Sequence, residues 1–272
     1  LDKQQIAKHL SDADIIAGSR TVIPLIKGAK KIKWIHCLSA GVETILTEDV
    51  IESKIIVSNS SGIHAIPIAE HVLGFMLIFT RRFYDTFKKQ QKKIWQRNQN
   101  ITELRDKTLL IVGLGNIGME IAKVASCLGM KVLGVKQNVK NKPDFVSKLY
   151  SKEQLDSALP KADFVAISLP LTPNTRHLFD ISKFKKMKKS AVIINIGRGP
   201  LIKEEDLILA LKKRIIYGAG LDVTEEEPLP KDNPLWDMEN VIITPHHSGW
   251  SEKYMDRATD LFCLNLKAYL KG

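Results

Sequence analysis

The sequence predicts an α/β fold of two lobes, in which a doubly wound parallel sheet is inserted into a smaller α/β lobe. Three observations predict it. From about residue 108 onward, apolar β-branched runs alternate with helical patterns, as expected of parallel strands buried on both faces. The first 95 residues follow a different pattern. The length of 272 residues suits one large or two medium domains.

The larger lobe is predicted to contain six strands joined by helices. Each strand is a short apolar run, and the helical patterns between the runs favour parallel βαβ units. The runs are TLLIVG (108–113), MKVLGV (130–135), DFVAISL (163–169), SAVIINI (190–196), IYGAGLDV (216–223) and NVIITP (240–245).

The smaller lobe is predicted to use both ends of the chain. Two short strands are expected over 14–17 and 33–37, ahead of a long helix over 66–95. The apolar beginning and lysine-rich end of that helix suit a connector between two lobes. A final helix over 251–270 is expected to return to the first lobe.

A polar segment marks the expected boundary between the lobes. NQNITELRDK (98–107) is rich in turn formers, so we place the boundary near residue 100. This division predicts a substrate domain from residues 1–98 and 250–272, and a dinucleotide-binding domain from residues 99–249.

Composition restricts the class of protein. The 41 Lys and Arg residues exceed the 30 Asp and Glu residues, and the resulting charge of +11 attracts anions without choosing among them. Basic runs at 27–33, 88–93 and 183–189 are interpreted as solvated faces. Three scattered cysteines indicate neither a disulfide framework nor a zinc site, and no membrane span, secretory signal or nucleic-acid module is found. We therefore expect a cytoplasmic protein with no metal and no membrane or nucleic-acid partner.

A glycine-rich turn is predicted where the first strand of the larger lobe meets the next helix. Gly113, Gly115 and Gly118 form the pattern G-x-G-x-x-G at this point. The first glycine permits a tight turn, the second lets the backbone approach a pyrophosphate, and the third lets helix and strand pack closely. Free N–H groups and the positive end of the helix then face the phosphates. The pattern predicts a Rossmann-type dinucleotide site.

The residue after the second strand indicates which dinucleotide is bound. An NAD site usually carries Asp or Glu there, which accepts hydrogen bonds from the adenosine ribose. This sequence has Lys136 instead, and an ammonium group would pair with a 2′-phosphate. The position favours NADP, with NAD as the alternative if Lys136 is a surface lysine.

Three further segments follow predicted strands: NIGRG (195–199), GLDVTEEEP (220–228) and TPHHSG (244–249). Ligands bind outside the carboxyl ends of such strands, so an arginine, a carboxylate and a histidine can converge there. Arg198 can hold a 2-oxo acid through its planar fork. A histidine can donate a proton to the carbonyl oxygen, and an adjacent carboxylate favours its protonated form. The residues alone leave open which of Glu225, Glu226 and Glu227, and which of His246 and His247, take these roles.

Seven ordered motifs resemble the D-isomer-specific 2-hydroxyacid dehydrogenase family, which includes phosphoglycerate dehydrogenases and glyoxylate/hydroxypyruvate reductases. The resemblance implies a flavodoxin-like substrate domain and reduction of a small 2-oxo acid, of the glyoxylate or hydroxypyruvate type, to a D-2-hydroxy acid. The motifs are SAGVETI (39–45), GIHAIPIAEHVLGFML (62–77), ELRDKTLLIVGLGNIGMEIA (103–122), SLPLTPNTRHLF (168–179), NIGRGPLI (195–202), GLDVTEEEPLP (220–230) and TPHHSG (244–249).

The resemblance also implies individual site residues. The catalytic set would be Arg198, Glu227 and His246, with Glu227 and His246 as the acid pair. The substrate carboxylate would be held by Arg198 and by backbone N–H groups at Ala40, Gly41 and Val42. The implied cofactor-binding set is Gly113, Gly115, Asn116, Ile117, Gly118, Lys136, Leu169, Pro170, Ile196, Gly197, Asp222, His246, Ser248 and Gly249, with Asp222 on the nicotinamide carboxamide.

We also expect the protein to form a homodimer. His64 departs from the family pattern, because many members have Asn at that position. An alternative function is a cofactor-sensing binding protein of the corepressor type, because some relatives act in that way. The complete set of Arg198, Glu227 and His246 favours the enzyme.

Overall fold

The computed structural model describes residues 9–10, 12–18, 31–39, 41–42 and 45–271. The chain divides into two compact units, Leu1–His64 with Trp250–Gly272 and Ala65–Gly249. Among the described residues, every helix is too short or too polar to cross a membrane.

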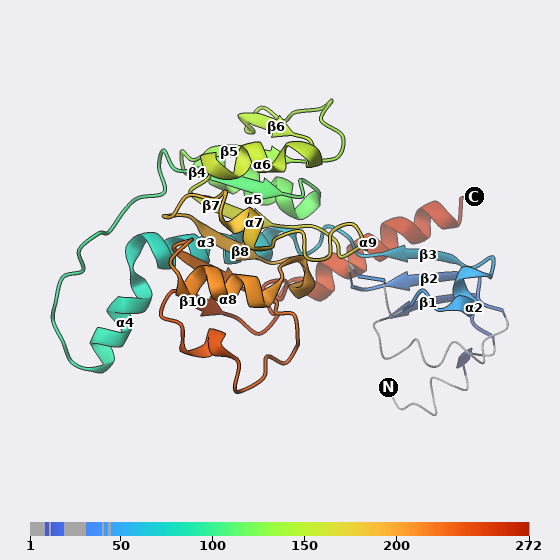
Figure 1. Cartoon of the computed structure of the whole chain (residues 1–272). Helices are drawn as coiled ribbons and strands as arrows, with labels where there is room; N and C mark the ends of the chain where they lie inside the picture. The colour runs from blue at the N-terminus through green and yellow to red at the C-terminus, as the bar shows by residue number, and fades with distance from the viewer. Residues whose placement is uncertain (1–8, 11, 19–30, 40, 43–44, 272) are drawn as a thin grey trace. The chain divides into compact units, whose positions relative to one another are not determined.

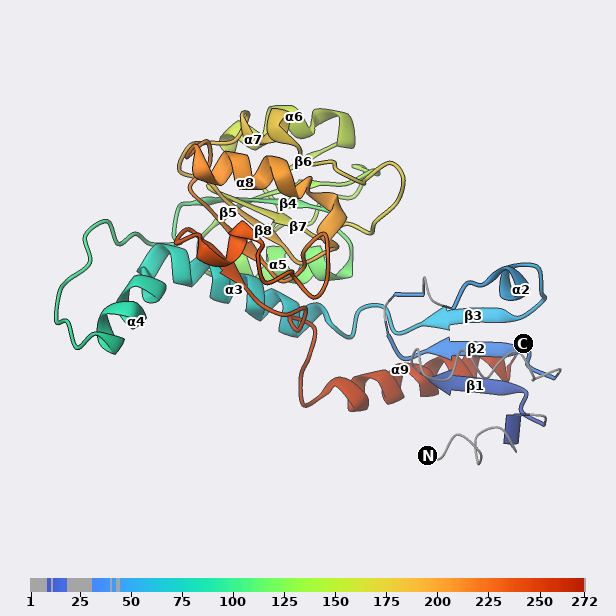
Figure 2. The same cartoon turned by 60° about the horizontal axis from the view of Figure 1, so that its bottom comes forward.

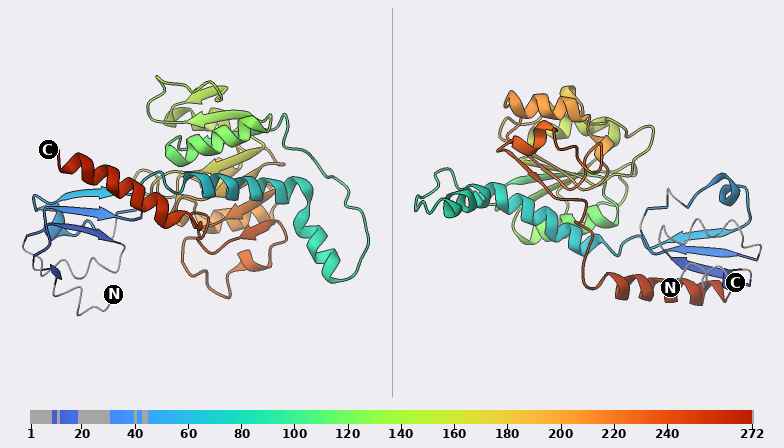
Figure 3. Two further views of the ribbon diagram at one scale, coloured as in Figure 1. Left: turned by 180° about the vertical axis from the view of Figure 1, so that it is seen from behind. Right: turned by 90° about the horizontal axis from the view of Figure 1, so that it is seen from below.

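The first unit is built on a three-stranded parallel sheet in the order β1-β2-β3. Helix α9 lies along one face of this sheet (Figure 3). Trp34 is buried there, and its ring stacks on Phe262 at 5.5 Å and on Tyr269 at 5.1 Å between centroids. As the sequence predicts, the last helix belongs to the first unit. The elements are β1 (Ile15–Gly18), β2 (Trp34–Cys37), α2 (Glu48–Ile51), β3 (Ile56–Asn59) and α9 (Tyr254–Tyr269).

The second unit contains a seven-stranded parallel sheet in the order β10-β9-β8-β7-β4-β5-β6. The strand order reverses between β4 and β7, which is where ligands bind in open α/β sheets, outside the carboxyl ends of the strands. The predicted doubly wound parallel sheet is confirmed. Its strands are β4 (Thr108–Val112), β5 (Lys131–Val135), β6 (Lys148–Tyr150), β7 (Phe164–Ile167), β8 (Val192–Asn195), β9 (Gly218–Leu221) and β10 (Val241–Ile243).

Helices cover both faces of this sheet: α3 and α5 lie on one face, and α6, α7 and α8 lie on the other (Figure 2). Strand β4 contributes side chains to the cores on both faces of the sheet: Leu109 and Ile111 belong to one core, and Leu110 and Val112 belong to the other. This double burial explains why the strand is a continuous apolar run. The elements are α3 (Ala65–Arg81), α5 (Asn116–Cys127), η2 (Lys152–Gln154), α6 (Leu155–Ala158), η3 (Leu159–Lys161), α7 (Ile181–Phe184), η4 (Gly199–Leu201), α8 (Glu204–Lys212) and η5 (Pro234–Asp237).

The single helix predicted over 66–95 is wrong, because two helices occupy this stretch. Helix α3 ends at Arg81, and α4 (Phe83–Gln91) begins after Arg82. The φ angle of Arg82 is 57°, in the left-handed region, which interrupts the helix. Figure 1 shows α4 and the segment after it projecting from the body of the second unit.

Helix α3 belongs to the second unit, so the compact units divide at His64 and not at the predicted residue 98. Phe75 and Phe79 lie against Gly220 and Gly218 of β9, where an added Cβ atom would come within 2.8 Å of each ring. Glycines in a strand allow this close approach of a helix. The division into a substrate domain and a dinucleotide-binding domain stays a prediction.

Two strands were not expected from the sequence. β3 is short and has only one apolar pair, Ile56 and Val57, before Ser58 and Asn59. β6 has three residues and begins with Lys148. Each lies at one edge of its sheet, where a strand has a single neighbour and needs less apolar sequence.

Candidate active site

The glycine-rich turn joins β4 to α5. Gly113 has a φ angle of +106°, and an added Cβ atom there would collide with the carbonyl oxygen of Ser168. An added Cβ atom on Gly118 would collide with the carbonyl oxygen of Gly113. At Gly115 it would meet no heavy atom within 4 Å. The turn is therefore tight at its first and third glycines and open at its second, next to the first N–H groups of α5, and this shape fits the pyrophosphate of a dinucleotide.

The loop after β8 is fixed by a buried amide. Asn195 is 1% exposed, its side-chain Nδ2 donates to the carbonyl oxygen of Arg198 at 3.0 Å, and its Oδ1 accepts from the N–H of Gly197 at 3.1 Å. Gly197 lies beside Leu169, which follows β7, and Leu169 also lies beside Gly113. The structure thus brings the ends of β4, β7 and β8 together with their predicted cofactor-binding residues.

Glu227 and His246 form a hydrogen-bonded pair at the same edge of the sheet. His246 Nδ1 lies 2.7 Å from Glu227 Oε2, and both side chains are partly exposed. The N–H of Thr224 donates to the other oxygen, Glu227 Oε1, at 3.2 Å. With Nδ1 on the carboxylate, Nε2 of the ring is the nitrogen left for a substrate.

The geometry distinguishes the alternatives that the sequence left open. Glu225 accepts a hydrogen bond from His177 Nε2 at 2.7 Å instead of facing His246. Glu226 offers its backbone carbonyl to the Thr224 hydroxyl at 2.7 Å. Of the two histidines, His246 faces Glu227 through Nδ1, whereas His247 donates its backbone N–H to Asp222 at 3.1 Å.

Asp222, directly after β9, is a buried carboxylate surrounded by donors. Its side chain is 1% exposed, and it accepts from the Thr244 hydroxyl at 2.6 Å, from His247 N–H at 3.1 Å and from Ser248 N–H at 3.1 Å. Burial acts to raise the pKa of Asp222, but the hydrogen bonds from Ser248, Thr244 and His247 outweigh it and hold the pKa below its ordinary value. The group is therefore a fixed anion.

His71, Asp222 and His247 offer possible metal-ligand atoms within 4.8 Å of one another. However, hydroxyl and N–H hydrogens already point at the Asp222 oxygens. A cation would face these donors, so the arrangement suits hydrogen bonding to a carboxamide better than metal binding.

The remaining predicted residues are placed as follows. Lys136 is exposed and directly follows β5. Gly41, in the first unit, accepts from the Ser39 hydroxyl through its carbonyl oxygen at 2.9 Å, and Val42 packs on that unit's core. Ala40 lies outside the described residues. The ring of His64, also in the first unit, lies 5.2 Å from that of Tyr254 between centroids, tilted by 54°, and the Tyr254 hydroxyl donates to the Leu38 carbonyl at 2.7 Å.

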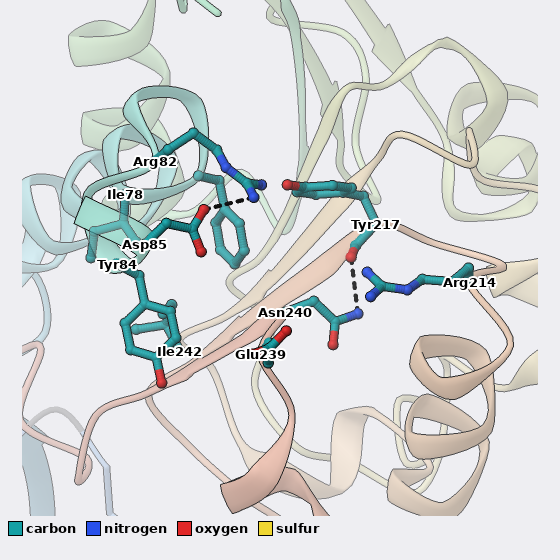
Figure 4. A pocket seen from close by; sticks show the side chains of 10 residues that line it. Ile78, Arg82, Tyr84, Asp85, Arg214, Tyr217, Glu239, Asn240 and Ile242 are labelled. Atoms are coloured by element: carbon teal, nitrogen blue, oxygen red, sulfur yellow. Dashed lines mark hydrogen bonds and ion pairs between the residues drawn. The ribbon is translucent and has the colours of Figure 1, made fainter. Parts of the chain in front are cut away.

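A separate pocket lies at the opposite edge of the larger sheet (Figure 4). Tyr217 and Asn240, which immediately precede β9 and β10, line it together with Arg82 and Arg214. Asp85 and Glu239 are also present, so the charges of the lining side chains balance. None of the predicted catalytic or cofactor-binding residues lines this pocket, and its lining favours no ligand class.

Comparison with known proteins gives the family. A family model described as "D-isomer specific 2-hydroxyacid dehydrogenase, NAD binding domain" matches residues 73–248. The chain belongs to this family. A D-3-phosphoglycerate dehydrogenase of Methanocaldococcus jannaschii is 36% identical over 279 residues, covering 100% of the chain and 52% of that protein. The chain thus spans about half the length of this dehydrogenase.

Solved structures of D-isomer specific 2-hydroxyacid dehydrogenases have the same fold. A family protein of Aeromonas salmonicida gives a TM-score of 0.89 at 34% identity, covering 100% of the chain and 86% of that structure. An NADPH-dependent glyoxylate/hydroxypyruvate reductase of Sinorhizobium meliloti, in complex with NADP and sulfate, gives 0.85 at 28% identity, covering 99% and 85%. The family model describes an NAD-binding domain, and these relatives are named as dehydrogenases or reductases.

Three side chains that shape the site were not assigned from the sequence. Asn195 and Thr244 lie within motifs that we singled out, but their buried hydrogen bonds depend on the fold. His71 lies in the helical stretch, and its Nε2 lies 3.0 Å from Oγ1 of Thr244, which is 173 positions away. The one available signal was the spacing of His71, Phe75 and Phe79, which puts all three on one helix face.

Proposed function

We propose that the protein reduces a small 2-oxo acid to a D-2-hydroxy acid, with glyoxylate or hydroxypyruvate as the type of substrate. The observation that carries this proposal is the contact of 2.7 Å between His246 Nδ1 and Glu227 Oε2 at the carboxyl edge of the sheet. The same edge carries the open glycine at position 115. A proton donor and a dinucleotide cradle are what the reaction requires.

The catalytic residues act on the substrate in distinct ways. Arg198 binds the substrate carboxylate and carbonyl oxygen, which orients the carbonyl carbon. His246 donates a proton from Nε2 to the carbonyl oxygen, while Glu227 holds Nδ1–H and stabilises the charged ring. When bound, the reduced nicotinamide supplies the hydride. Backbone N–H groups of residues 40–42 are proposed as a further carboxylate contact.

Residues at three strand ends would hold the cofactor. The turn at Gly113, Gly115 and Gly118 would receive the pyrophosphate, and Asp222 would accept from the carboxamide. Lys136 favours NADP, because it stands exposed at the position that reads the adenosine ribose. The NADP complex of the Sinorhizobium meliloti reductase is consistent with this preference.

Lys136→Asp tests the cofactor preference. A carboxylate at this position repels a 2′-phosphate and accepts from the ribose hydroxyls, so the ratio of kcat/KM for NADPH over NADH should fall, by about tenfold or more. Lys131→Asp is the matched control, because Lys131 is exposed at the amino end of the same strand. An unchanged ratio in Lys136→Asp would remove Lys136 from cofactor selection.

The activity is tested by following oxidation of NADPH and NADH with glyoxylate, hydroxypyruvate, pyruvate and longer 2-oxo acids. Turnover with at least one is expected. Cofactor binding without turnover of any would contradict the proposed enzyme and favour the sensing protein.

We also propose a homodimer in the cytoplasm. The exposed aromatic side chains of α4 and the segment after it, Phe83, Phe87 and Trp95, are consistent with a covered surface in a dimer. The mass in solution, measured by light scattering, checks this proposal. A monomer at micromolar concentration would contradict it.

A further inference from the structure

The register between α3 and β9 places a histidine at the candidate nicotinamide site. Phe79 packs on Gly218 and Phe75 on Gly220, so a step of four residues back along the helix matches a step of two forward along the strand. Four helical residues rise about 6 Å and two strand residues about 6.6 Å, so the register is maintained. The next step pairs His71 with Asp222.

A hydroxyl group connects these two side chains. His71 Nε2 lies 3.0 Å from Thr244 Oγ1, and Thr244 Oγ1 lies 2.6 Å from Asp222 Oδ1. The direct distance from His71 Nε2 to Asp222 Oδ1 is 3.8 Å, too long for a hydrogen bond. Thr244 therefore mediates the interaction.

The directions of the two hydrogen bonds follow from the number of protons. A threonine hydroxyl has one hydrogen, and an ionised carboxylate can only accept, so Thr244 donates to Asp222. Thr244 must then accept from His71, which requires a hydrogen on Nε2. The structure thus assigns the tautomer of His71 and gives one direction to the chain of donors from His71 through Thr244 to Asp222.

His71 is held in place by aromatic contacts as well. Its ring meets Phe75 edge-on at 4.7 Å and His247 edge-on at 5.5 Å between centroids. Its side chain is 19% exposed. Because the His71 ring is held on a rigid helix, it can fix the orientation of the Thr244 hydroxyl. The oriented hydroxyl then occupies one lone pair of Asp222 and leaves the others available to a ligand.

We propose that His71 is a positioning residue for the nicotinamide end of the cofactor, acting through Thr244 on Asp222. The inference rests on the proposed role of Asp222 in binding the carboxamide. It assigns no contact between His71 and the cofactor itself. Because the proposed partner of Asp222 is the carboxamide, we expect the effect only with ligands that carry the nicotinamide.

The test uses two matched pairs of variants. His71→Gln keeps an N–H donor near the position of Nε2, while His71→Leu fills similar space without a donor. Thr244→Ser keeps the hydroxyl, while Thr244→Val removes it at nearly constant shape. For each protein, fluorescence titration gives the Kd of the preferred dinucleotide and of its ADP-ribose counterpart, which lacks the nicotinamide.

We expect His71→Leu and Thr244→Val each to weaken dinucleotide binding by about three- to tenfold. Because both residues act through one chain of hydrogen bonds, the double variant should bind no more weakly than the weaker of the two single variants. His71→Gln and Thr244→Ser should stay within about twofold of wild type. Binding of the ADP-ribose compound should be unchanged throughout. Equal weakening of both ligands would indicate a merely structural role and overturn the inference.

A spectroscopic measurement tests the tautomer without any ligand. Nitrogen-15 NMR of the histidine rings should show His71 protonated at Nε2, and the signal should shift in Thr244→Val. A ring protonated only at Nδ1 would overturn the inference. If the wild type binds neither NADPH nor NADH, the proposed function fails and the inference fails with it. If the wild type binds and His71→Leu binds equally well, only the inference fails.

Discussion

Two histidine–carboxylate arrangements stand at the carboxyl edge of the larger sheet, and they differ in burial and directness. His246 and Glu227 are partly exposed and in direct contact at 2.7 Å. His71 and Asp222 are mostly buried and connected through the Thr244 hydroxyl. The same residue types therefore serve two environments, because His71 lies on α3 and Asp222 directly follows β9, whereas His246 lies in the loop after β10.

This difference in burial indicates which of the two pairs can exchange a proton with a substrate. An exposed ring nitrogen opposite a carboxylate can reach a reacting oxygen and be reprotonated by water. The buried ring of His71 donates its Nε2–H to the Thr244 hydroxyl, so it fixes the orientation of that hydroxyl instead of transferring a proton. Burial lowers the pKa of His71, Asp222 acts to raise it, and His247 acts to lower it, so burial keeps the ring neutral.

The largest effect is expected from His246→Gln. Loss of the proton donor should lower kcat by about 100- to 10,000-fold, while the Kd of the cofactor stays within about twofold. His177→Gln is the matched control, because His177 pairs with Glu225 at the same distance of 2.7 Å and has no proposed role. Steady-state kinetics and fluorescence titration check both. A wild-type kcat in His246→Gln would move the proton donor elsewhere.

A smaller effect is expected from Arg198→Lys. An ammonium keeps the charge but cannot reproduce the planar fork, so KM for the 2-oxo acid should rise by about 10- to 100-fold, the equivalent of one charge-assisted hydrogen bond. The kcat of the variant should fall as well, because orientation of the carbonyl carbon is lost. Initial rates over a range of substrate concentrations measure both. An unchanged KM would exclude Arg198 from substrate binding.

The smallest effect concerns stability and pH. The folded-state pKa of His71 lies below the ordinary value of 6.5, so between these two values the unfolded chain binds more protons than the folded one. The free energy of unfolding should therefore fall as pH decreases through this range. His36 and His64, whose pKa values are also lowered by burial, act in the same direction.

Chemical denaturation at about pH 7.5 and 5.5 measures this dependence. His71→Gln has no ring to titrate, so its loss of stability on acidification should be smaller than that of the wild type. Equal losses would show that His71 does not hold a lowered pKa in the folded protein.

Local sequence was sufficient for the parts of the site that depend on strand ends. The run TLLIV followed by Gly113, Gly115 and Gly118 predicts both the sheet and the turn, because a continuous apolar run and the positive φ angle of Gly113 each have a local signature. The family resemblance added the choice of Glu227 and His246. Their contact could not be derived from spacing, because the loop after β9 decides which glutamate faces the ring.

Long-range packing was the part that local sequence could not predict. The placement of α3 depends on two phenyl rings meeting two glycines that lie about 140 residues later, so the compact units divide at His64 and not near residue 98. The same packing brings His71 to Thr244. The break at Arg82 was missed because helical periodicity continues on both sides of it.

The central claim is hydride transfer to a 2-oxo acid at this edge of the sheet, and isotope transfer tests it most directly. The protein is incubated with NADPH or NADH carrying deuterium at nicotinamide C4, in each configuration, and with glyoxylate, hydroxypyruvate or pyruvate. Mass spectrometry and chiral chromatography should find a hydroxy acid with deuterium at C2 from one cofactor configuration, and the D-isomer wherever the product is chiral. Bound cofactor with no labelled hydroxy acid from any substrate would contradict the account.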